Sequence, residues 1–436
     1  MSKSRDPMGG PGWGATITRR GFLQVAGATA ALAATWPLTE GVVRAGSARP
    51  LKIGVISVRN GGHPGMRHDF LDAIALAFDQ AAASSAPIQT TLVTRTADGG
   101  HGGAYTAARY LLAHQVDVVI AEISAPVALI LAPLFADAGV PLVVANVGGH
   151  LSRPTDRRAQ LLHSSLLLTE ASYALGGWAA AYLGKRTYLI ASAADAGYDS
   201  LYAFRRGFQR AGGTVAGLSV THERPRYSRL GIALAKARAA GPDFVFAHYS
   251  GQLAVEFIKA YGSSSLSSVP LAGASFLADE LVLKSAGSRA NGIVTAASWP
   301  LAVTALGGTS PAAQAFSTAY LARTGRVAGA FAVLGYDAAG VVIAGIRNIQ
   351  ASGLGTKGLI DSLAGQTVPS ARGALRVDAD TNTVVGDVVV RRVQVSAGTP
   401  ANAIVATITG VDAFPDGLAS MDRSLASGYV NEYLCT

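Results

Sequence analysis

The clearest pattern of apolar and polar positions lies in residues 187–262. Apolar runs of strand length alternate there with amphipathic segments, and the runs lie at residues 187–192, 214–220 and 243–247. The first amphipathic segment places Leu201, Phe204 and Phe208 on one face at helical spacing. Three strand–helix units in succession predict a parallel, doubly wound sheet with helices on both faces.

The same alternation precedes this stretch, with strands predicted at residues 52–57, 88–93, 117–121 and 141–145. The chain is therefore predicted to be an α/β protein with two similar doubly wound lobes, joined near residues 163–169. The run at 292–296 is predicted to return the chain to the first lobe. From about residue 371 the pattern consists mainly of strands. We therefore assign residues 46–167 and 293–368 to the first lobe, and residues 168–292 and 369–436 to the second.

Composition and the N-terminal residues indicate an exported protein. Half of the 436 residues are apolar and 14% are charged, fewer than the ~25% typical of soluble domains, so the chain is rich in core residues. Residues 18–24 contain the pair Arg19 and Arg20, followed by a mildly apolar run and small residues at 43–45. This order is typical of a twin-arginine signal peptide, which we assign to residues 1–45.

Charge and cysteine content limit the possible partners. The chain carries 36 basic and 27 acidic residues, and without the five basic and two acidic residues of 1–45 the net charge is +6. These charges are spread over helix faces, which argues against nucleic-acid binding. Cys435 is the single cysteine, so no internal disulfide can form, and none lies near the cleavage site to carry a lipid. No later apolar run reaches the ~20 residues of a membrane span. A soluble periplasmic protein is expected.

The order of several stretches resembles the periplasmic solute-binding proteins of the leucine/isoleucine/valine type, which serve ABC importers and are related to amide- and urea-binding receptors. The stretches that carry the resemblance are 52–57, 117–124 with 138–142, 197–200 with 204–213, 336–338, and 371–373 with 377–378 and 387–393. The resemblance implies the type I periplasmic binding fold, in which three hinge segments join two lobes that close on a small ligand. It also implies permease and ATPase partners, no catalytic residues and no cofactor.

Ligands of doubly wound sheets bind beyond the carboxyl ends of the strands. By position, the resemblance implies a pocket that includes Ser124 and Asn146 of the first lobe. Tyr198, Tyr249 and the loop at Ser275 and Phe276 would complete it from the second lobe. Hydroxyls and helix N-terminal amides can hold a carboxylate or carbonyl oxygen there. His248 lies at a strand end and is a further candidate.

The loop at 273–276 lacks the acidic residue with which amino-acid binders of this type pair the ligand's ammonium group. Glu122, Asp195 or Asp199 could substitute for it. Without one of them, an α-amino acid would leave a buried charge unpaired, which favours an amide or another small organic solute. The expected function is thus capture of a small polar organic solute, such as an amino acid or an amide.

Other interpretations remain open at this stage. Ser124 and Asn146 could cap the helices that follow them, Tyr198 and Tyr249 could pack within their lobe, and His248 could be an ordinary hydrogen-bonded histidine. The same fold could present its solute to a sensor. An exported enzyme is disfavoured because the chain lacks a GxSxG elbow and the spacing of metal-binding histidines, and its GxGxxG at 353–358 follows no strand.

Overall fold

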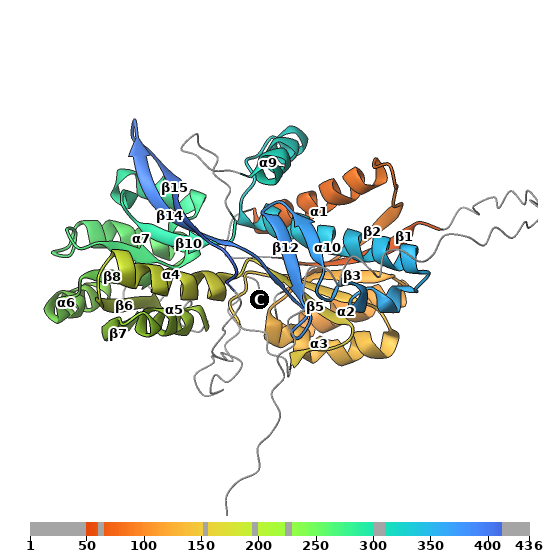
Figure 1. The fold of residues 1–436 in the computed structure, drawn as a ribbon, viewed down its shortest axis with the longest axis horizontal. Helices are drawn as coiled ribbons and strands as arrows, with labels where there is room; N and C mark the ends of the chain where they lie inside the picture. Colours follow the sequence, from red (N-terminus) through yellow and green to blue (C-terminus); the bar gives the residue numbers. More distant parts are fainter. Residues whose placement is uncertain are drawn as a thin grey trace, which may run out of the picture. The chain divides into compact units, whose positions relative to one another are not determined.

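The computed structural model describes residues 49–59, 65–98, 100–150, 156–193, 199–222, 229–299 and 310–411. The predicted signal peptide, Asp195, Tyr198 and Cys435 lie outside these residues. The described chain forms two sheets, each packed between helices (Figure 1).

The first sheet has eight strands in the order β11-β12-β13-β5-β4-β3-β1-β2. Its strands are β1 (Leu51–Val58), β2 (Thr90–Ala97), β3 (Val118–Glu122), β4 (Leu142–Asn146), β5 (Leu161–Ser165), β11 (Thr367–Ser370), β12 (Gly373–Asp378) and β13 (Thr383–Val385). The ladders from β2 to β5 are parallel, whereas β11, β12 and β13 form an antiparallel meander that joins β5 through β13.

Five helices cover this sheet: α1 (Met66–Ala82), α2 (His101–Ala113), α3 (Ala125–Ala138), α9 (Pro311–Thr324) and α10 (Ala330–Ser352). Apolar residues of α1 and α10 pack with Val55, Ile120 and Val143 on one face. Residues of α2 and α3 pack with Ile56 and Val144 on the other. The alternation along each strand thus supplies both faces of a three-layer lobe.

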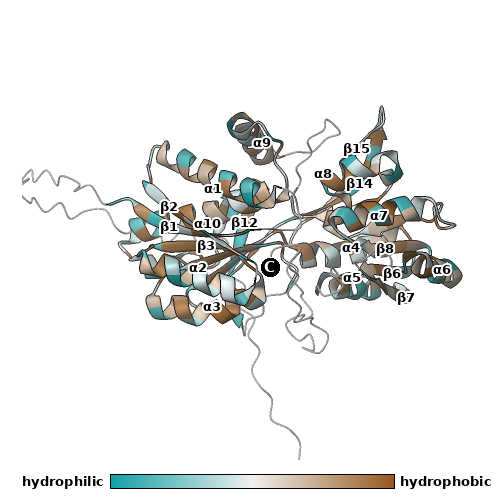
Figure 2. Cartoon of the chain, turned by 180° about the vertical axis from the view of Figure 1, so that it is seen from behind, coloured by the Kyte–Doolittle hydropathy of each residue, from teal (hydrophilic) through white to brown (hydrophobic). Residues whose placement is uncertain are grey.

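The second sheet has seven strands in the order β15-β14-β10-β9-β8-β6-β7. Its strands are β6 (Arg186–Ser192), β7 (Thr214–Thr221), β8 (Phe244–His248), β9 (Leu271–Gly273), β10 (Val294–Ala297), β14 (Val388–Ser396) and β15 (Thr399–Ile408). Helices α4 (Leu168–Tyr182) and α5 (Asp199–Arg210) share a core with one face. Helices α6 (Leu230–Ala240), α7 (Gly251–Gly262) and α8 (Glu280–Ala286) pack on the other. Figure 2 shows that the helices carry both apolar and polar residues. The short 3₁₀ turns are η3 (Ser275–Ala278), η4 (Gly287–Ala290), η5 (Thr356–Gly358) and η6 (Asp361–Leu363).

The chain passes between the two sheets three times. It leaves the first sheet after β5, returns between β10 and α9, and leaves it again between β13 and β14. The first passage falls at residues 166–167, within the predicted joint at 163–169. Two α/β lobes joined by three segments are what the sequence predicted, and this fold class is confirmed.

The sheets correct the predicted assignment of two segments to lobes. The strand predicted at 292–296 to return to the first lobe is β10, which pairs with β9 and β14 inside the second sheet. Residues 373–385, assigned to the second lobe, form β12 and β13 of the first sheet. The error has a physical cause, because an apolar strand has the same local pattern whichever sheet it joins. The remaining domain boundaries stay predictions.

Helix α10 forms part of the core of the first lobe. It is the one described helix long and apolar enough to cross a membrane by length and composition. However, 72% of its apolar window is buried within the protein, and it packs along α1 and against β4 and β5. Gly335 permits this approach, since a Cβ there would lie 2.3 Å from the carbonyl oxygen of Phe70 on α1.

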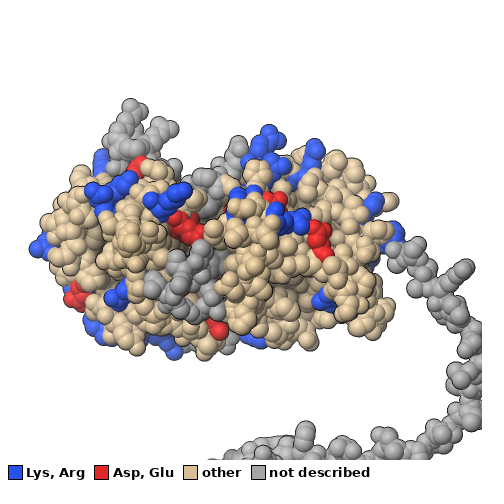
Figure 3. Space-filling view, turned by 90° about the horizontal axis from the view of Figure 1, so that it is seen from above, with Lys and Arg blue, Asp and Glu red and all other residues tan. Residues whose placement is uncertain are grey.

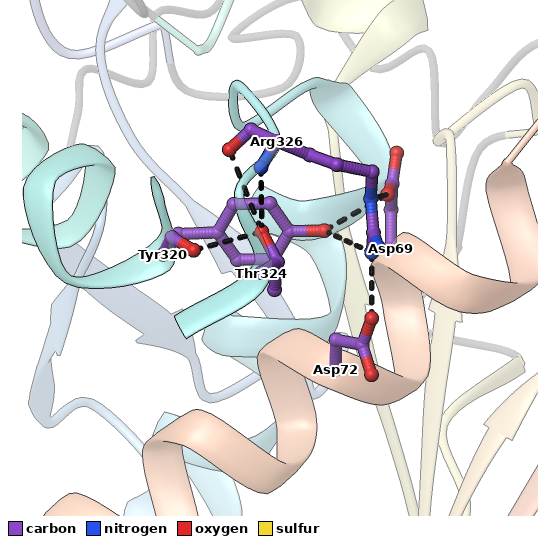
Figure 4. Close-up of polar contacts among 5 residues, drawn as sticks. All are labelled: Asp69, Asp72, Tyr320, Thr324 and Arg326. Carbon is purple, nitrogen blue, oxygen red and sulfur yellow. Dashed lines mark hydrogen bonds and ion pairs between the residues drawn. The ribbon is translucent and has the colours of Figure 1, made fainter. Parts of the chain in front are cut away.

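A polar cluster fixes the α9–α10 connection to α1 (Figure 4). The Arg326 guanidinium contacts Asp69 at 3.1 Å and Asp72 at 2.5 Å, and the Tyr320 hydroxyl donates to Asp69 at 2.8 Å. Thr324 accepts from the Arg326 backbone N–H at 3.1 Å. Burial and the hydrogen bond to Asp69 raise the pKa of Tyr320, so its hydroxyl remains a donor. The cluster connects helices that are about 250 residues apart in the sequence.

Candidate functional site

The first lobe presents Ser124 and Asn146 at the carboxyl edge of its sheet, as predicted. Ser124 is the N-cap of α3, and its Oγ accepts from the Val127 N–H at 3.5 Å. The Asn146 amide donates to the Ile123 carbonyl at 3.2 Å, and its Oδ1 accepts from the Gly148 N–H at 2.8 Å. Both side chains are buried and hold backbone groups in place, so the predicted capping role of Ser124 is observed. Their contact with a solute remains a prediction.

Glu122 is the last residue of β3 and is fully buried. Its Oε2 accepts from the Val58 N–H at 3.0 Å, while Oε1 has no hydrogen-bond partner among the described residues. Burial raises the pKa of Glu122 to about 8, against the smaller lowering effects of the Val58 N–H and the Arg67 charge. At neutral pH this carboxyl group is therefore mostly protonated.

The second lobe contributes His248 and Tyr249 at the end of β8. The His248 Nε2 lies 3.4 Å from the Ser200 hydroxyl, and burial lowers the pKa of His248 to about 3. Such a histidine is neutral and a poor general base. The Tyr249 hydroxyl lies 2.7 Å from the Thr221 Oγ1, and its ring stacks on Phe257 at 4.4 Å between centroids. Both side chains pack within the lobe, as one of the sequence interpretations expected.

Ser275 and Phe276 lie in η3, beside an aromatic cluster. The Ser275 hydroxyl donates to the Ala296 carbonyl at 2.6 Å, which fixes the loop to β10. The Phe276 ring lies 5.2 Å from the Trp299 ring and 6.1 Å from that of Phe331 on α10, measured between centroids. These rings form an apolar wall between the two lobes. Of the three residues, the sequence analysis named only Phe276 as a candidate.

Arg391 on β14 lies behind this wall and was not predicted. It is buried, and its Nη2 donates to the Ser275 carbonyl at 3.0 Å and to Thr295 Oγ1 at 3.2 Å. Its guanidinium carbon lies 5.5 Å from the centroid of the Trp299 ring. Burial lowers the pKa of Arg391 to about 10, and the charges of Asp279 and Glu280 oppose this effect.

The two lobes meet near the candidate site. The Asp199 N–H donates to the Gly149 carbonyl at 2.9 Å, and the His150 Nδ1 lies 3.8 Å from the Asp199 carboxylate. These contacts link the start of α5 to the loop after β4. They bring the strand ends of both lobes to the same region, which is the arrangement that a solute site between lobes requires.

Arg372 connects two of the passages between lobes. Its Nε donates to Asp337 at 2.6 Å, its Nη1 to the Ser298 hydroxyl at 2.6 Å and its Nη2 to the Ser165 carbonyl at 2.9 Å. Ser298 in turn donates to the Leu166 carbonyl at 2.6 Å. Sequence reasoning noticed residues 336–338 and 371–373 only as part of a resemblance, because nothing local indicates that Asp337 and Arg372 are paired.

A second buried carboxyl group lies near this network. Glu170 belongs to the first turn of α4, and burial raises its pKa to about 7. Its own backbone N–H and the charge of Arg372 lower the pKa, while Asp199 raises it. Glu170 is thus a second buried acid with a raised pKa, and it lies on α4 of the second lobe.

The distribution of charge agrees with a small-molecule site. On the face shown in Figure 3, lysine and arginine side chains are distributed over both halves and interspersed with acidic residues. A continuous basic stripe, as nucleic-acid binding requires, is not seen on that face.

A model of the periplasmic binding protein family matches residues 50–399. The chain resembles a substrate-binding protein of an ABC transporter from Sphaerobacter thermophilus, with 24% identity, a TM-score of 0.74, and coverage of 83% of this chain and 99% of that one. A solute-binding protein from Rhodopseudomonas palustris BisB5 in complex with 3,4-dihydroxybenzoic acid has 24% identity and a TM-score of 0.69, covering 83% and 97%. The leucine-binding protein LivK of Thermotoga maritima has 20% identity and a TM-score of 0.65, covering 83% and 99%. A search of curated proteins gave no match.

The chain belongs to the periplasmic binding protein family, whose members are extracytoplasmic solute-binding proteins and not enzymes. The predicted resemblance to the leucine/isoleucine/valine-binding type is confirmed by this match and by the shared fold. The prediction that the protein has no enzymatic activity is confirmed in the same way.

Proposed function

We propose that this protein is the solute-binding component of an ABC importer, and that it captures a small organic solute between its lobes by hinge closure. The family match over residues 50–399 is the observation that carries the proposal. The three passages of the chain between the lobes support the hinge, because a few residues of such connections can absorb a change in backbone angles. A permease and an ATPase would be its partners.

The proposed solute carries a carboxylate or an amide group. The loop after β9 has no acidic side chain to pair with an ammonium group, and the Ser275 carbonyl is already occupied by Arg391. The Phe276 and Trp299 rings, whose planes are inclined by 44° to each other, supply apolar contact area. Two structurally similar solute-binding proteins, both from Rhodopseudomonas palustris, were solved in complex with 3,4-dihydroxybenzoic acid and with 4-hydroxybenzoate. Among the small polar organic solutes that the sequence analysis expected, these observations favour an aromatic acid over an amino acid.

The proposal also includes export to the periplasm by the twin-arginine route, on the basis of Arg19 and Arg20. Replacement of both by lysine should leave the protein in the cytoplasm, whereas the unmodified chain should reach the periplasmic fraction. Periplasmic recovery of the double variant would contradict this route.

Thermal unfolding against a panel of solutes tests the proposed binding. The panel contains benzoate, 4-hydroxybenzoate, benzamide, urea and L-leucine. A solute at 100 times its dissociation constant should stabilise the folded protein by ~2.7 kcal/mol. A raised midpoint with one chemical class supports the proposal and identifies that class. An unchanged midpoint across the panel and across further small solutes contradicts it.

A further inference from the structure

The register of the first sheet places three polar side chains in one row across four neighbouring strands. Glu122 lies opposite Ala145, and Ala145 lies opposite Ser164. Ile56 lies opposite Ala121, so the next residue, Ser57, continues the row beside Glu122. All four residues lie within the last two positions of their strands, at the carboxyl edge where ligands of such sheets bind.

The row lies on the sheet face that α1 and α10 cover. Two residues before each member of the row is an apolar residue of that core, namely Val55, Ile120, Val143 and Leu162. Since side chains two apart in a strand point to the same face, Ser57, Glu122 and Ser164 extend from this face too. Ala145, with its short side chain, separates Glu122 from Ser164.

Each of these polar side chains has a buried atom without a hydrogen bond within the part of the chain that the structure describes. The atoms are Ser57 Oγ, Glu122 Oε1 and Ser164 Oγ, in residues that are 1%, 0% and 0% exposed. A buried polar group without a partner destabilises the folded state, and three in one row are unusual. Apolar residues would serve the core better, which indicates that the row has a role in binding.

The charges around the row favour a ligand that accepts hydrogen bonds. Arg67, in the first turn of α1, is the charged side chain that acts on Glu122, and its Nε is also buried without a partner. The acidic side chains of the covering helices are paired with arginines: Asp69 and Asp72 with Arg326, Asp79 with Arg323, and Asp337 with Arg372.

Protonated Glu122, two hydroxyls and a guanidinium together form a set of donors. Such a set matches a carboxylate, whose two oxygens accept several hydrogen bonds. An ammonium group would find one protonated acid and one arginine there, so the set disfavours it.

We infer that Ser57, Glu122 and Ser164, together with Arg67, form a subsite that binds the carboxylate of the solute, with Glu122 as a protonated donor. This inference rests on the proposed function. It names the chemical class of the solute and a group that selects it. It also makes binding depend on a proton, because ionised Glu122 would repel the carboxylate.

Calorimetric titration of the full chain with benzoate, and with benzamide as its neutral counterpart, tests the subsite. Because the pKa of Glu122 is about 8, the affinity for benzoate should fall about tenfold between pH 7 and pH 9, as the protonated fraction falls. Near pH 9, titrations in buffers of different ionisation enthalpy should show the uptake of about one proton for each benzoate bound. The affinity for benzamide should change much less.

The Glu122→Gln variant should bind benzoate with nearly constant affinity from pH 7 to pH 9 and without proton uptake, because glutamine keeps a donor but cannot ionise. Glu170→Gln is the matched control, since Glu170 is the other buried acid with a raised pKa but lies on α4. This control should retain the loss of affinity near pH 8.

Ser164→Ala gives a second test that does not depend on how well the glutamine variant folds. Removal of an unpartnered buried hydroxyl should leave the melting temperature unchanged or raise it. The same change should weaken benzoate binding about tenfold, as expected for loss of a hydrogen bond to a charged group.

Three outcomes would overturn the inference. Benzoate binding with the same pH dependence in Glu122→Gln as in the unmodified chain would remove Glu122 from the site. Unchanged affinity in Ser164→Ala would indicate that the row holds ordered water only. After either of these two results for Glu122→Gln and Ser164→Ala the proposed function would stand, because the protein still binds a solute. Absence of binding by any solute to the folded protein would contradict the proposed function and the inference with it.

Discussion

Two buried arginines lie where the lobes meet, and their surroundings differ. Arg372 forms a 2.6 Å ion pair with Asp337, and its side chain and that of its partner are 2% and 0% exposed. Arg391 is also buried, but among the described residues it has no ion pair within 4 Å and donates to a carbonyl and a hydroxyl. It faces the Trp299 ring instead.

The difference separates an arginine whose charge is paired from one whose charge has no close carboxylate among the described residues. The hydrogen bonds of Arg372 are used to hold the Ser165 and Ser298 segments together. Arg391 retains a buried Nε without a partner and carries a charge that no described carboxylate contacts directly. A buried charge that lacks a close partner is costly to keep, and such groups are common at binding sites.

The largest effect is expected from Arg372→Met. The change leaves the Asp337 carboxylate buried without its partner, so the free energy of unfolding should fall by about 3–5 kcal/mol. Chemical denaturation measures this loss. Arg323→Met, which breaks an exposed pair with Asp79, is the control and should cost about 0–1 kcal/mol. Equal losses in the two variants would contradict the structural role of Arg372.

Arg391→Met should lower stability less than Arg372→Met does, and it should weaken solute binding more. The Ser275 carbonyl and the Thr295 hydroxyl lose a donor, which costs about 1–3 kcal/mol, but no close carboxylate is left unpaired. If the guanidinium acts on the solute, benzoate should bind more weakly than to the unmodified chain. Denaturation and calorimetry measure the two effects. A loss of stability as large as that of Arg372→Met would abolish the distinction between the two arginines.

The pH dependence of stability also distinguishes the two arginines, through their effect on Glu170. Folding raises the pKa of Glu170 to about 7, so between the ordinary glutamate pKa and pH 7 the folded state retains a proton that the unfolded state has lost. The contribution of Glu170 to stability should therefore fall as pH rises through this range, by at most about 1.4 kcal/mol per pH unit, and Glu122 adds an effect of the same sign.

Arg372 lowers the pKa of Glu170, so Arg372→Met should raise that pKa, whereas Arg391→Met should leave it unchanged. Carboxyl carbon chemical shifts, followed by NMR through a pH titration, measure the change. A shift of equal size in both variants would indicate that the effect comes from general loosening and not from the arginine charge.

The smallest effect is expected from Trp299→Phe. The ring beside Arg391 is kept, but phenylalanine binds a cation more weakly than tryptophan, so stability should change by about 1 kcal/mol. Affinity for an aromatic acid should fall only a few-fold if Phe276 and residue 299 form the wall of the site. No change in affinity, measured by calorimetry, would place the solute away from this wall.

Much of the protein was determined by local sequence. The alternation of apolar runs and amphipathic segments defines the strands β6 to β8 and their helices, since side-chain periodicity is a local property. The predicted positions of Ser124, Asn146 and His248 at the carboxyl edges follow from the same pattern. The order of short stretches was enough to identify the family.

Which sheet each strand joins was known only from the tertiary structure, because it depends on packing between residues distant in the sequence. β10 and β13 look alike in sequence, yet β10 lies in the second sheet and β13 in the first. Contacts between distant residues, such as the pair Asp337 and Arg372, were equally hidden. The row of Ser57, Glu122 and Ser164 depends on the register of four strands, and a shift of one residue would turn each side chain to the other face. Register is set by packing over the whole lobe, so no local pattern could have shown it.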